Sequence, residues 1–572
     1  MAQTQPYGFP CKGGLDLNRS SFDLQEEAGV ATQLVNFEVD GDGGYHKIKG
    51  CTKVTNDVKS RIVVSPTIDD VVNPLTTSFS IKGIIGYKKG GIAVSGSSIY
   101  FTQNGIDWMQ LDRITTDAAG EDHATFIARS AAGGTISSKP ISFIVYESAA
   151  SEDQIIICNG VTAPFQILIT GYSSSPLNLT YKVTQIEISH GEAGYVLKPT
   201  TGATHKNRLV LAGDEAHPNS VFYSDVITGD ISFSGGSSGI VVLEDKVVGV
   251  SHFKDTVVVF CKSSIHKIEN LGDANNQRVV TISKNVGCVS KETIQELGGD
   301  LIFLAQDGLR TLAGTDKIDD TELGTVSRPI RTILDKKILE NINLLDLASV
   351  VVKSKNQYRL FYSNSATPAL STSAGRENDI KNSEGIIATL TSQGLEFSET
   401  KGMQCKAIAS IVLDNIETIY HGDRYGAILR HDKGTGFFTD EQYKNIRAVY
   451  RTPYLDFGDM GTQKTLNYVN LKLEAEGVVT PTLGIRYGEE NYTPIQPADI
   501  VLPRLTLPSN FGSARFSNSV YEFAFGALTS PLIRQAVQGS GNTVQIKLLS
   551  DDQKASFSVQ GIYINYYPSG RR

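Results

Sequence analysis

The chain of 572 residues is too long for a single hydrophobic core, and we expect it to divide into two to four domains. Its composition, with 40% hydrophobic and 20% charged residues, 54 Gly, 23 Tyr and 23 Phe, predicts a soluble, mainly β protein with many tight turns. The net charge of −8 argues against tight non-specific DNA binding, which needs Lys and Arg to displace counterions, although DNA can still be a neighbour.

The charge is unevenly distributed. Residues 441–572 contain 13 Lys/Arg and 11 Asp/Glu, so the first 440 residues carry −10. The beginning of the chain has no secretion signal, and no apolar run approaches the roughly 20 residues that span a bilayer. We therefore expect no membrane-spanning segment and no secretion by the usual route. Solitary cysteines without a C-x-x-C motif predict buried, reduced thiols made in a cytoplasm, at Cys11, Cys51, Cys158, Cys261, Cys288 and Cys405.

Residues 1–80 are predicted to form an N-terminal arm and a hairpin that pack on, or complete, the β domains. A strand ends at Val39, a glycine-rich turn follows, and a second strand runs through Lys49. Asp40 and Asp42 resemble the start of a calcium loop. The twelfth position of that loop is Cys51 rather than a bidentate Glu, so a hairpin turn is the better interpretation.

Residues 81–440 repeat one pattern, in which an apolar strand, a turn and a second strand follow one another. Successive apolar strands are separated by 63, 54, 48, 45, 56 and 61 residues when they are counted from Ile92, Ile155, Leu209, Val257, Ile302, Tyr358 and Ile419. Repeats of roughly 40–50 residues that each form a small antiparallel sheet are typical of a β-propeller. The sequence thus predicts a propeller of six or seven blades, with insertions between some of them.

One stretch, residues 285–341, combines this pattern with a helix. Short strands are expected at 293–297, 301–305 and 309–312, joined by Gly-Gly and Asp-Gly turns. A helical insertion near 327–345 should follow, with Ser327 as its cap and Pro329 in its first turn, and with an apolar face of Ile330, Ile333, Leu334 and Ile338. Residues 363–381 are interpreted as an exposed loop.

The pattern changes after Thr439. Strands of sandwich length are expected at 447–456, 466–474, 482–487, 544–549 and 557–566. Residues 441–572 are therefore predicted to form a separate C-terminal β-sandwich or platform domain.

Several short patterns resemble catalytic motifs without their structural context. Gly235–Gly239 matches G-x-S-x-G, but a loop rather than a strand precedes the serine. Gly458–Thr465 lacks the second glycine of a phosphate loop, because Gln463 occupies its place. The pairs Asp319-Asp320 and Asp551-Asp552 are assigned to turns, and the nine His show no zinc spacing. The sequence thus predicts no catalytic, cofactor-binding or metal residues, and no enzyme.

The order of segments along the chain resembles the tail nozzle proteins of short-tailed bacteriophages, also called packaged-DNA stabilisation proteins. The segments are GGLDLNRSSFDLQEEAGVATQLVNFEVDGDGGYHKIKG, KNRLVLAGDEAHPNSVFYSD, VVGVSHFKDTVVVFCKSSIHKIE, the block from VGCVSKETIQELGG to LGTVSRPI, and QGIYINYYPSGRR. They extend from about Gly13 to Arg572. The blades resemble one another only poorly, which departs from a regular repeat and leaves their number open.

This resemblance implies a virion structural protein that is assembled in the host cytoplasm. Six copies would form a homohexameric nozzle ring below the portal and the head–tail adaptor, in contact with tail fibres or a needle protein. The ring would retain packaged double-stranded DNA and conduct its ejection without reading its sequence. Alternatives are a baseplate or hub protein of a longer-tailed phage, a propeller glycan hydrolase, and a receptor-binding module.

A channel that conducts DNA should avoid attractive basic contacts, because Asp and Glu repel the polyanion and keep its counterions mobile. We expect acidic loops such as 316–320 or the pair Asp214-Glu215 to face the lumen, with ordinary solvated loops as an equal alternative. Arg328, Arg331 and the terminal pair Arg571-Arg572 either contact acidic partners or are simply solvated.

Overall fold

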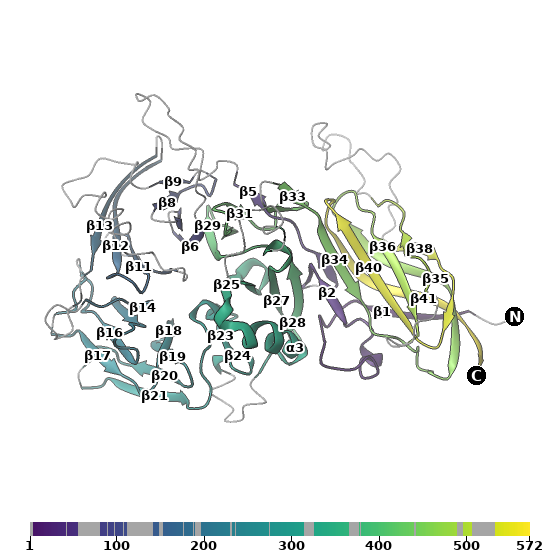
Figure 1. Cartoon of the computed structure of the whole chain (residues 1–572), viewed down its shortest axis with the longest axis horizontal. Coiled ribbons are helices and arrows are strands. Elements are labelled where there is room, and N and C mark those ends of the chain that lie inside the picture. The colour runs from purple at the N-terminus through teal and green to yellow at the C-terminus, as the bar shows by residue number, and fades with distance from the viewer. Residues whose placement is uncertain are drawn as a thin grey trace, which may run out of the picture.

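A computed structural model shows a mainly β chain (Figure 1). It describes residues 4–571 except for 42, 55–79, 89, 96–97, 107, 111–140, 148–152, 175–176, 187, 189–195, 229–230, 235, 274, 314–324, 365–376, 378, 440–441, 489–495 and 506–531. Within this part of the chain, no helix is both long and apolar enough to cross a membrane.

Seven small antiparallel sheets, here called ring sheets one to seven, follow one another along the described chain. The first four contain β6 (Ile81–Tyr87), β7 (Gly90–Ser95), β8 (Ser98–Thr102) and β9 (Met109–Gln110); β10 (Ser142–Glu147), β11 (Asp153–Cys158), β12 (Phe165–Ser174) and β13 (Leu177–Gln185); β14 (Thr201–His205), β15 (Arg208–Ala212), β16 (Ser220–Tyr223) and β17 (Gly239–Val242); and β18 (Val247–Phe253), β19 (Thr256–Cys261), β20 (Ile265–Glu269) and β21 (Arg278–Ser283). The last three contain β22 (Gln295–Leu297), β23 (Asp300–Ala305) and β24 (Gly308–Thr311); β25 (Leu345–Val352), β26 (Gln357–Asn364), β27 (Glu384–Thr391) and β28 (Gly394–Lys401); and β29 (Ala407–Leu413), β30 (Ile416–Gly422) and β31 (Ile428–Arg430), joined by β5 (Thr52–Lys53).

The first strands of these sheets lie next to one another around a common centre, as the left half of Figure 1 shows. Strand β6 contacts β10 and β29, β10 contacts β14, and β14 contacts β18. The series continues through the short 3₁₀ helix η3 (Lys291–Thr293) before β22, then through β25 to β29. This succession of meander sheets fits the β-propeller that the sequence predicts.

The apolar residues used to count the repeat all lie in the second strand of a ring sheet. They are Ile92, Ile155, Leu209, Val257, Ile302, Tyr358 and Ile419, and each is buried. Both faces of such a strand are covered by neighbouring sheets, which explains why the run is continuously apolar rather than alternating. The repeat in the sequence is therefore confirmed as a repeat of strands.

The seventh ring sheet is completed from the other end of the chain. Thr52 and Lys53 of β5 pair antiparallel with Arg430 and Leu429 of β31. Gly50 lies so close to Gly436 that a Cβ would come within 2.0 Å of the Gly436 carbonyl oxygen. The N-terminal segment is thus built into the ring.

The predicted helical insertion is present as four short helical segments. These are η4 (Arg328–Ile330), α3 (Arg331–Ile333), the π-type η5 (Leu334–Ile338) and η6 (Leu339–Leu344). The apolar face is buried as expected, and Pro329 lies in the first turn. Ser327, however, does not cap the helix: its Oγ accepts a hydrogen bond from the backbone N–H of Leu309, at 2.9 Å. The prediction of that cap is wrong because β24 supplies a donor that is not local in sequence.

The expected exposed loop at 363–381 lies mostly outside the described residues. At its end, Asp379 and Ile380 are buried, so this part is not the exposed loop that the sequence predicted. The Asp379 carboxylate accepts hydrogen bonds from Arg424 and Tyr425, which explains how a charged residue is retained there.

Two large sheets, one of which continues ring sheet six, share one hydrophobic core (Figure 1, right). The seven-stranded sheet contains β1 (Gln5–Pro10), β3 (Phe37–Val39), β4 (Tyr45–Lys47), β35 (Thr462–Ala475), β38 (Leu532–Ala536), β39 (Ser540–Gly541) and β41 (Phe557–Arg571). The nine-stranded sheet contains ring sheet six together with β2 (Gln33–Val35), β34 (Ile446–Arg451), β36 (Thr482–Tyr487), β37 (Ile500–Val501) and β40 (Val544–Asp552). Outside these sheets lie the strand pair β32 (Phe437–Thr439) and β33 (Gln442–Lys444) and the 3₁₀ turns η1 (Gln25–Glu27) and η7 (Lys353–Lys355).

Ring sheet six and the C-terminal strands thus form one continuous sheet. Strand β2 lies between β28 of the ring and β34, pairing parallel with the first and antiparallel with the second. The residue after it, Asn36, is buried and left-handed, with φ of 54°. Its side chain donates to the carbonyls of Lys401 and Arg447 and accepts from the Lys401 N–H and the Thr400 hydroxyl. One asparagine therefore bonds to both sides of the junction.

Candidate functional site

The centre of the ring is crossed by a lysine. Lys291, in η3, donates from Nζ to Ser142 Oγ in ring sheet two and to the Thr200 carbonyl just before ring sheet three, both at 2.5 Å. Two complete sheets separate β10 from η3 along the ring, so this side chain reaches across the middle. Nearby, Ser349 of β25 donates to the Glu292 carbonyl. At this level, side chains tie the inner parts of ring sheets two, three, five and six together.

Of the acidic residues expected at a lumen, the structure describes only the pair Asp214-Glu215. The loop 316–320 lies outside the described residues. Asp214 is buried, and its carboxylate accepts from the backbone N–H groups of Lys198 and His217 at 2.9 and 3.1 Å. Asp214 is therefore a turn-forming residue rather than an exposed repulsive charge, which corrects the prediction. Its neighbour Glu215 is exposed.

The short motif-like patterns have structural roles in the described residues. Ser237 of the G-x-S-x-G string donates its hydroxyl to Asp225 Oδ1 at 2.7 Å. Lys464 of the incomplete phosphate loop is buried in β35, a strand, and donates to the carbonyls of Asp459 and Asn542. Asp551 and Asp552 are the last residues of β40, not a turn as predicted, and Asp552 accepts from Lys47 at 2.9 Å. Among the described residues, no group of three or more His, Cys, Asp or Glu is arranged to hold a metal ion.

All six cysteines are free and buried, as the sequence predicted. Burial raises the pKa of Cys11, Cys51, Cys158, Cys261 and Cys288 to about 12 in each case. The thiolate form is therefore disfavoured, and these side chains act as small apolar residues of the core.

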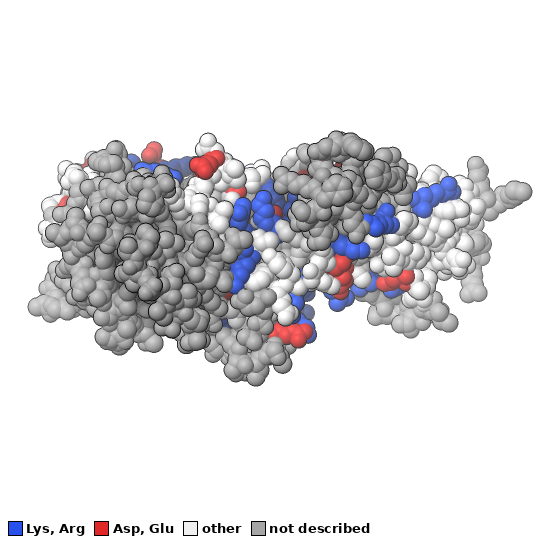
Figure 2. Space-filling view, turned by 90° about the horizontal axis from the view of Figure 1, so that it is seen from above, with Lys and Arg blue, Asp and Glu red and all other residues white. Residues whose placement is uncertain are grey.

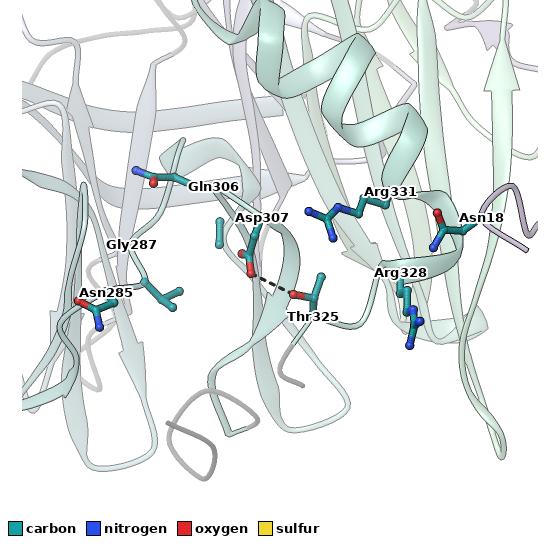
Figure 3. Close-up of a pocket in the computed structure, with 10 residues that line it drawn as sticks. Asn18, Asn285, Gly287, Gln306, Asp307, Thr325, Arg328 and Arg331 are labelled. Atoms are coloured by element: carbon teal, nitrogen blue, oxygen red, sulfur yellow. Dashed lines mark hydrogen bonds between the residues drawn. The ribbon is translucent and has the colours of Figure 1, made fainter. Parts of the chain in front are cut away.

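A pocket of about 500 Å³ lies where ring sheet five, the helical insertion and the N-terminal arm meet (Figure 3). Its lining comes from four segments, of which only Asn18 is distant in the sequence: Asn18, Asn285–Gly287, Ala305–Asp307 and Thr325 with Arg328 and Arg331. Figure 3 shows the Arg331 guanidinium of α3 directed toward Asp307, while the side chain of Arg328, at the start of η4, extends away from it.

The walls of this pocket are held by backbone bonds. The Leu17 N–H donates to the Pro329 carbonyl at 2.9 Å, which attaches the arm to the helix. The Val326 N–H donates to the Leu309 carbonyl at 3.0 Å, which attaches the start of the helix to β24. A Cβ on Gly287 would come within 2.2 Å of the Lys262 carbonyl oxygen, so that wall is closely packed against ring sheet four.

The one carboxylate of the lining is fully engaged. Asp307 accepts from Arg310 Nε at 2.9 Å and Nη2 at 2.5 Å, and from the Thr325 hydroxyl at 3.1 Å. Burial raises the pKa of Asp307, but the hydrogen bonds and charge of Arg310 outweigh it, so the pKa lies below its usual range. Asp307 therefore stays ionised, and buried Arg310 neutralises its charge.

The sequence indicates Arg328 and Arg331 as candidate contacts for an acidic partner. It does not indicate the three amide side chains that line the same pocket. Arg328 and Arg331 are exposed, and the structure brings them together with Asn18, Asn285 and Gln306. The tight turn that contains Gln306 was recognised from its Asp-Gly signal, but nothing local connects it to Asn18. Arg571 lies in β41.

Comparisons with known proteins add little to this description. No family model matches the chain, and no curated protein matches it. The solved structures with some similarity include BamB from Moraxella catarrhalis, with 10% identity over 63% of this chain and 95% of that one, at a TM-score of 0.29. They also include the exo-β-1,3-galactanase from Phanerochaete chrysosporium, with 9% identity over 91% and 100% of the two chains and a TM-score of 0.24. The WD40 domain of Neurospora crassa Pan2 has 8% sequence identity, covering 68% of this chain and 95% of that one, at a TM-score of 0.31. At such TM-scores the assignment of the fold rests on the chain's own strands and their pairing.

Proposed function

We propose that the seven ring sheets are the blades of a closed seven-bladed β-propeller, and that this chain is a tail nozzle subunit of a short-tailed bacteriophage. Six copies would surround a conduit below the portal and adaptor, retain packaged DNA and conduct its ejection. The support is the order of sequence segments shared with that family, together with a ring of meander sheets joined to a second β unit.

One observation determines where such a conduit would have to be. Lys291 links sheets on opposite sides of the ring, so the passage for DNA lies between copies and not along the axis of one propeller. A wall made of several chains needs subunits of fixed shape. The continuous nine-stranded sheet and the bonds of Asn36 supply that rigidity, because they hold the ring against the C-terminal strands.

The outer face of the seven-stranded sheet is proposed as a contact between copies. Leu532 and Tyr563 are 46% and 49% exposed, and the Arg534 guanidinium lies 3.8 Å from the centre of the Tyr468 ring. Exposed Tyr, Leu and Arg on one sheet face are typical of the centre of an interface. On the face seen in Figure 2, Lys and Arg lie over the middle and towards the end that holds the two termini, with Asp and Glu among them. By sequence, residues 1–440 carry −10 and residues 441–572 carry +2. Opposite charges on different parts of one chain favour contacts between copies.

The test is the assembly state of the purified full-length chain, measured by mass photometry and electron microscopy with and without the adaptor. We expect rings of six copies with an open centre, and we expect Leu532→Asp to abolish them. The matched control is Ile416→Asp, at a position 66% exposed on ring sheet seven, which should leave the rings intact. A chain that stays monomeric at all concentrations, with and without the adaptor, contradicts the proposal. A ring attached to a long tail tube would instead favour the hub protein of a longer-tailed phage.

A further inference from the structure

We propose that the pocket between ring sheet five and the helical insertion is a binding site for a phosphate group carried by a small molecule. This inference is independent of the tail function, because it concerns one chain and needs no assembly.

The first step is the charge of the pocket. Asp307 is neutralised by Arg310, which is only 1% exposed and forms part of the wall. Among the residues that the structure describes, the remaining charged lining groups are Arg328 and Arg331, so this part of the lining has an excess of positive charge. Arg328 has no ion-pair partner among the described residues. The ion pair of Arg331 is with Asp335, at 3.4 Å, where both side chains are about half exposed and the attraction is weak.

The second step is the geometry of the donors. Arg328 begins η4 and Arg331 begins α3, three residues later. Figure 3 shows Arg331 directed toward Asp307 and Arg328 extending away from it, and both side chains are exposed, so their rotatable bonds allow them to turn toward one anion. Each guanidinium presents a planar fork of N–H donors that matches two oxygens of an anion. A single carboxylate has only two oxygens and is satisfied by one fork, whereas a phosphate has enough oxygens to accept from both. The amide groups of Asn18 and Asn285 also line this space and can donate, whereas Gln306 Nε2 donates to the Lys262 carbonyl at 3.4 Å.

The third step is size. A volume of about 500 Å³ exceeds what a bare phosphate needs and falls within the range of small-molecule sites. The part of the pocket near Val286, Gly287 and Ala305 has few polar side-chain atoms and would contact the rest of the ligand. The expected ligand class is thus a phosphate monoester such as a nucleotide or a sugar phosphate, with inorganic phosphate binding more weakly.

The experiment measures binding of inorganic phosphate and of AMP to the full-length chain by isothermal titration calorimetry at constant ionic strength. We expect one saturable site for each probe, with AMP binding more tightly. Arg328→Gln and Arg331→Gln should each weaken binding by about tenfold or more, as the loss of one charge-assisted contact predicts. Both arginines are exposed, so these variants should fold, and circular dichroism checks this.

The matched control is Arg278→Gln. Arg278 lies on β21, is 70% exposed and pairs with Glu269 away from the pocket lining. Its substitution should leave binding unchanged. The proposal is overturned if neither probe gives saturable binding, or if the two pocket variants bind like the wild type. It is also overturned if Arg278→Gln weakens binding as much as the pocket variants do, because that result indicates a general effect of charge. Tighter binding of a DNA duplex than of AMP, lost in the same variants, would overturn the small-molecule class and assign the pocket to nucleic acid.

Discussion

Single residues carry the connection between the parts of this chain, and Glu38 is the clearest charged example. This buried carboxylate on β3 accepts hydrogen bonds from Lys355, Gln357 and Arg359 of ring sheet six and its turn, at 2.8, 3.1 and 3.2 Å. Asp432, next to ring sheet seven, shares Arg359 with it at 3.2 Å. The buried charges of Glu38, Arg359 and Asp432 are tolerated because each of these side chains has more than one oppositely charged or hydrogen-bonding partner.

Removal of the Glu38 charge should destabilise the fold. We expect Glu38→Gln to lower the free energy of unfolding by about 3 kcal/mol, because Arg359 and Lys355 stay buried or half-buried with one carboxylate fewer. Urea unfolding followed by circular dichroism measures this. The control Glu27→Gln removes an acid that is 53% exposed and forms a surface ion pair with Arg19, and it should cost less than about 1 kcal/mol. Equal effects of the two substitutions would contradict this account.

The same residue predicts a pH dependence. Burial raises the pKa of Glu38, but the nearby His46, whose Nδ1 lies 3.6 Å from the carboxylate, and the charges of Lys355 and Arg359 outweigh it and lower the pKa to about 2. The folded state therefore binds this proton less readily than the unfolded chain, whose Glu titrates near 4.5. The stabilisation is complete above pH 4.5 and is lost as the pH falls towards 2. In Glu38→Gln the fall in stability across this window should be smaller than in the wild type.

At the scale of elements, the repeat in the sequence predicted strands but not their partners. Each anchor residue lies in a second strand, because the second strand of a meander sheet has a neighbour on both edges and packs on both faces. The closing strand β5 has only two residues and no apolar pattern, so its pairing with β31 could not be predicted locally. Closure depends on a contact between the two ends of the ring segment, which only the folded chain brings together.

Glycine at position 50 is required for that closure. An alanine there would place its Cβ 2.0 Å from the Gly436 carbonyl oxygen and 2.7 Å from the Gly436 nitrogen, and backbone atoms cannot move aside cheaply. We expect Gly50→Ala to destabilise the protein by about 1–3 kcal/mol, as measured by thermal unfolding. Gly41→Ala is the matched control in the same N-terminal segment, because no atom lies within 4 Å of a Cβ there. If both variants melt alike, β5 does not close the ring in solution.

At the scale of the whole molecule, one continuous sheet connects the ring with the C-terminal strands. The sequence predicted a separate C-terminal β-sandwich because the strand pattern changes after Thr439. The structure instead continues ring sheet six through β2 into β34. A short insertion strand from the N-terminus carries no signal of its own that could reveal such a junction.

Asn36 offers a test of this coupling. We expect Asn36→Ala to lower the free energy of unfolding by about 3 kcal/mol or more, since several buried backbone groups lose a partner and alanine is strained at a φ of 54°. Asn36→Gly keeps the backbone conformation and removes only the hydrogen bonds, so its effect should be smaller.

The single tryptophan, Trp108, lies in the ring next to β9 and reports the ring by fluorescence, while circular dichroism reports all strands. During urea unfolding of the wild type, fluorescence and circular dichroism should change at the same urea concentration. In Asn36→Ala, the fluorescence transition of the ring should have a different midpoint from the circular dichroism transition of all strands. Coincident transitions in the variant would show that the coupling does not depend on Asn36.

The sequence by itself determined the mainly β class, the positions of the buried second strands, the helical insertion with its apolar face, and the buried free cysteines. These features depend on local periodicity, turn residues and composition, which are properties of short segments. Only the tertiary structure decided that β5 closes the ring, that β2 and Asn36 join two sheets, that Asp214 is buried, and that Asn18, Asn285, Gln306, Arg328 and Arg331 share one pocket. Each of these depends on contacts between residues far apart in the chain, and no local pattern records which distant segment will supply the partner.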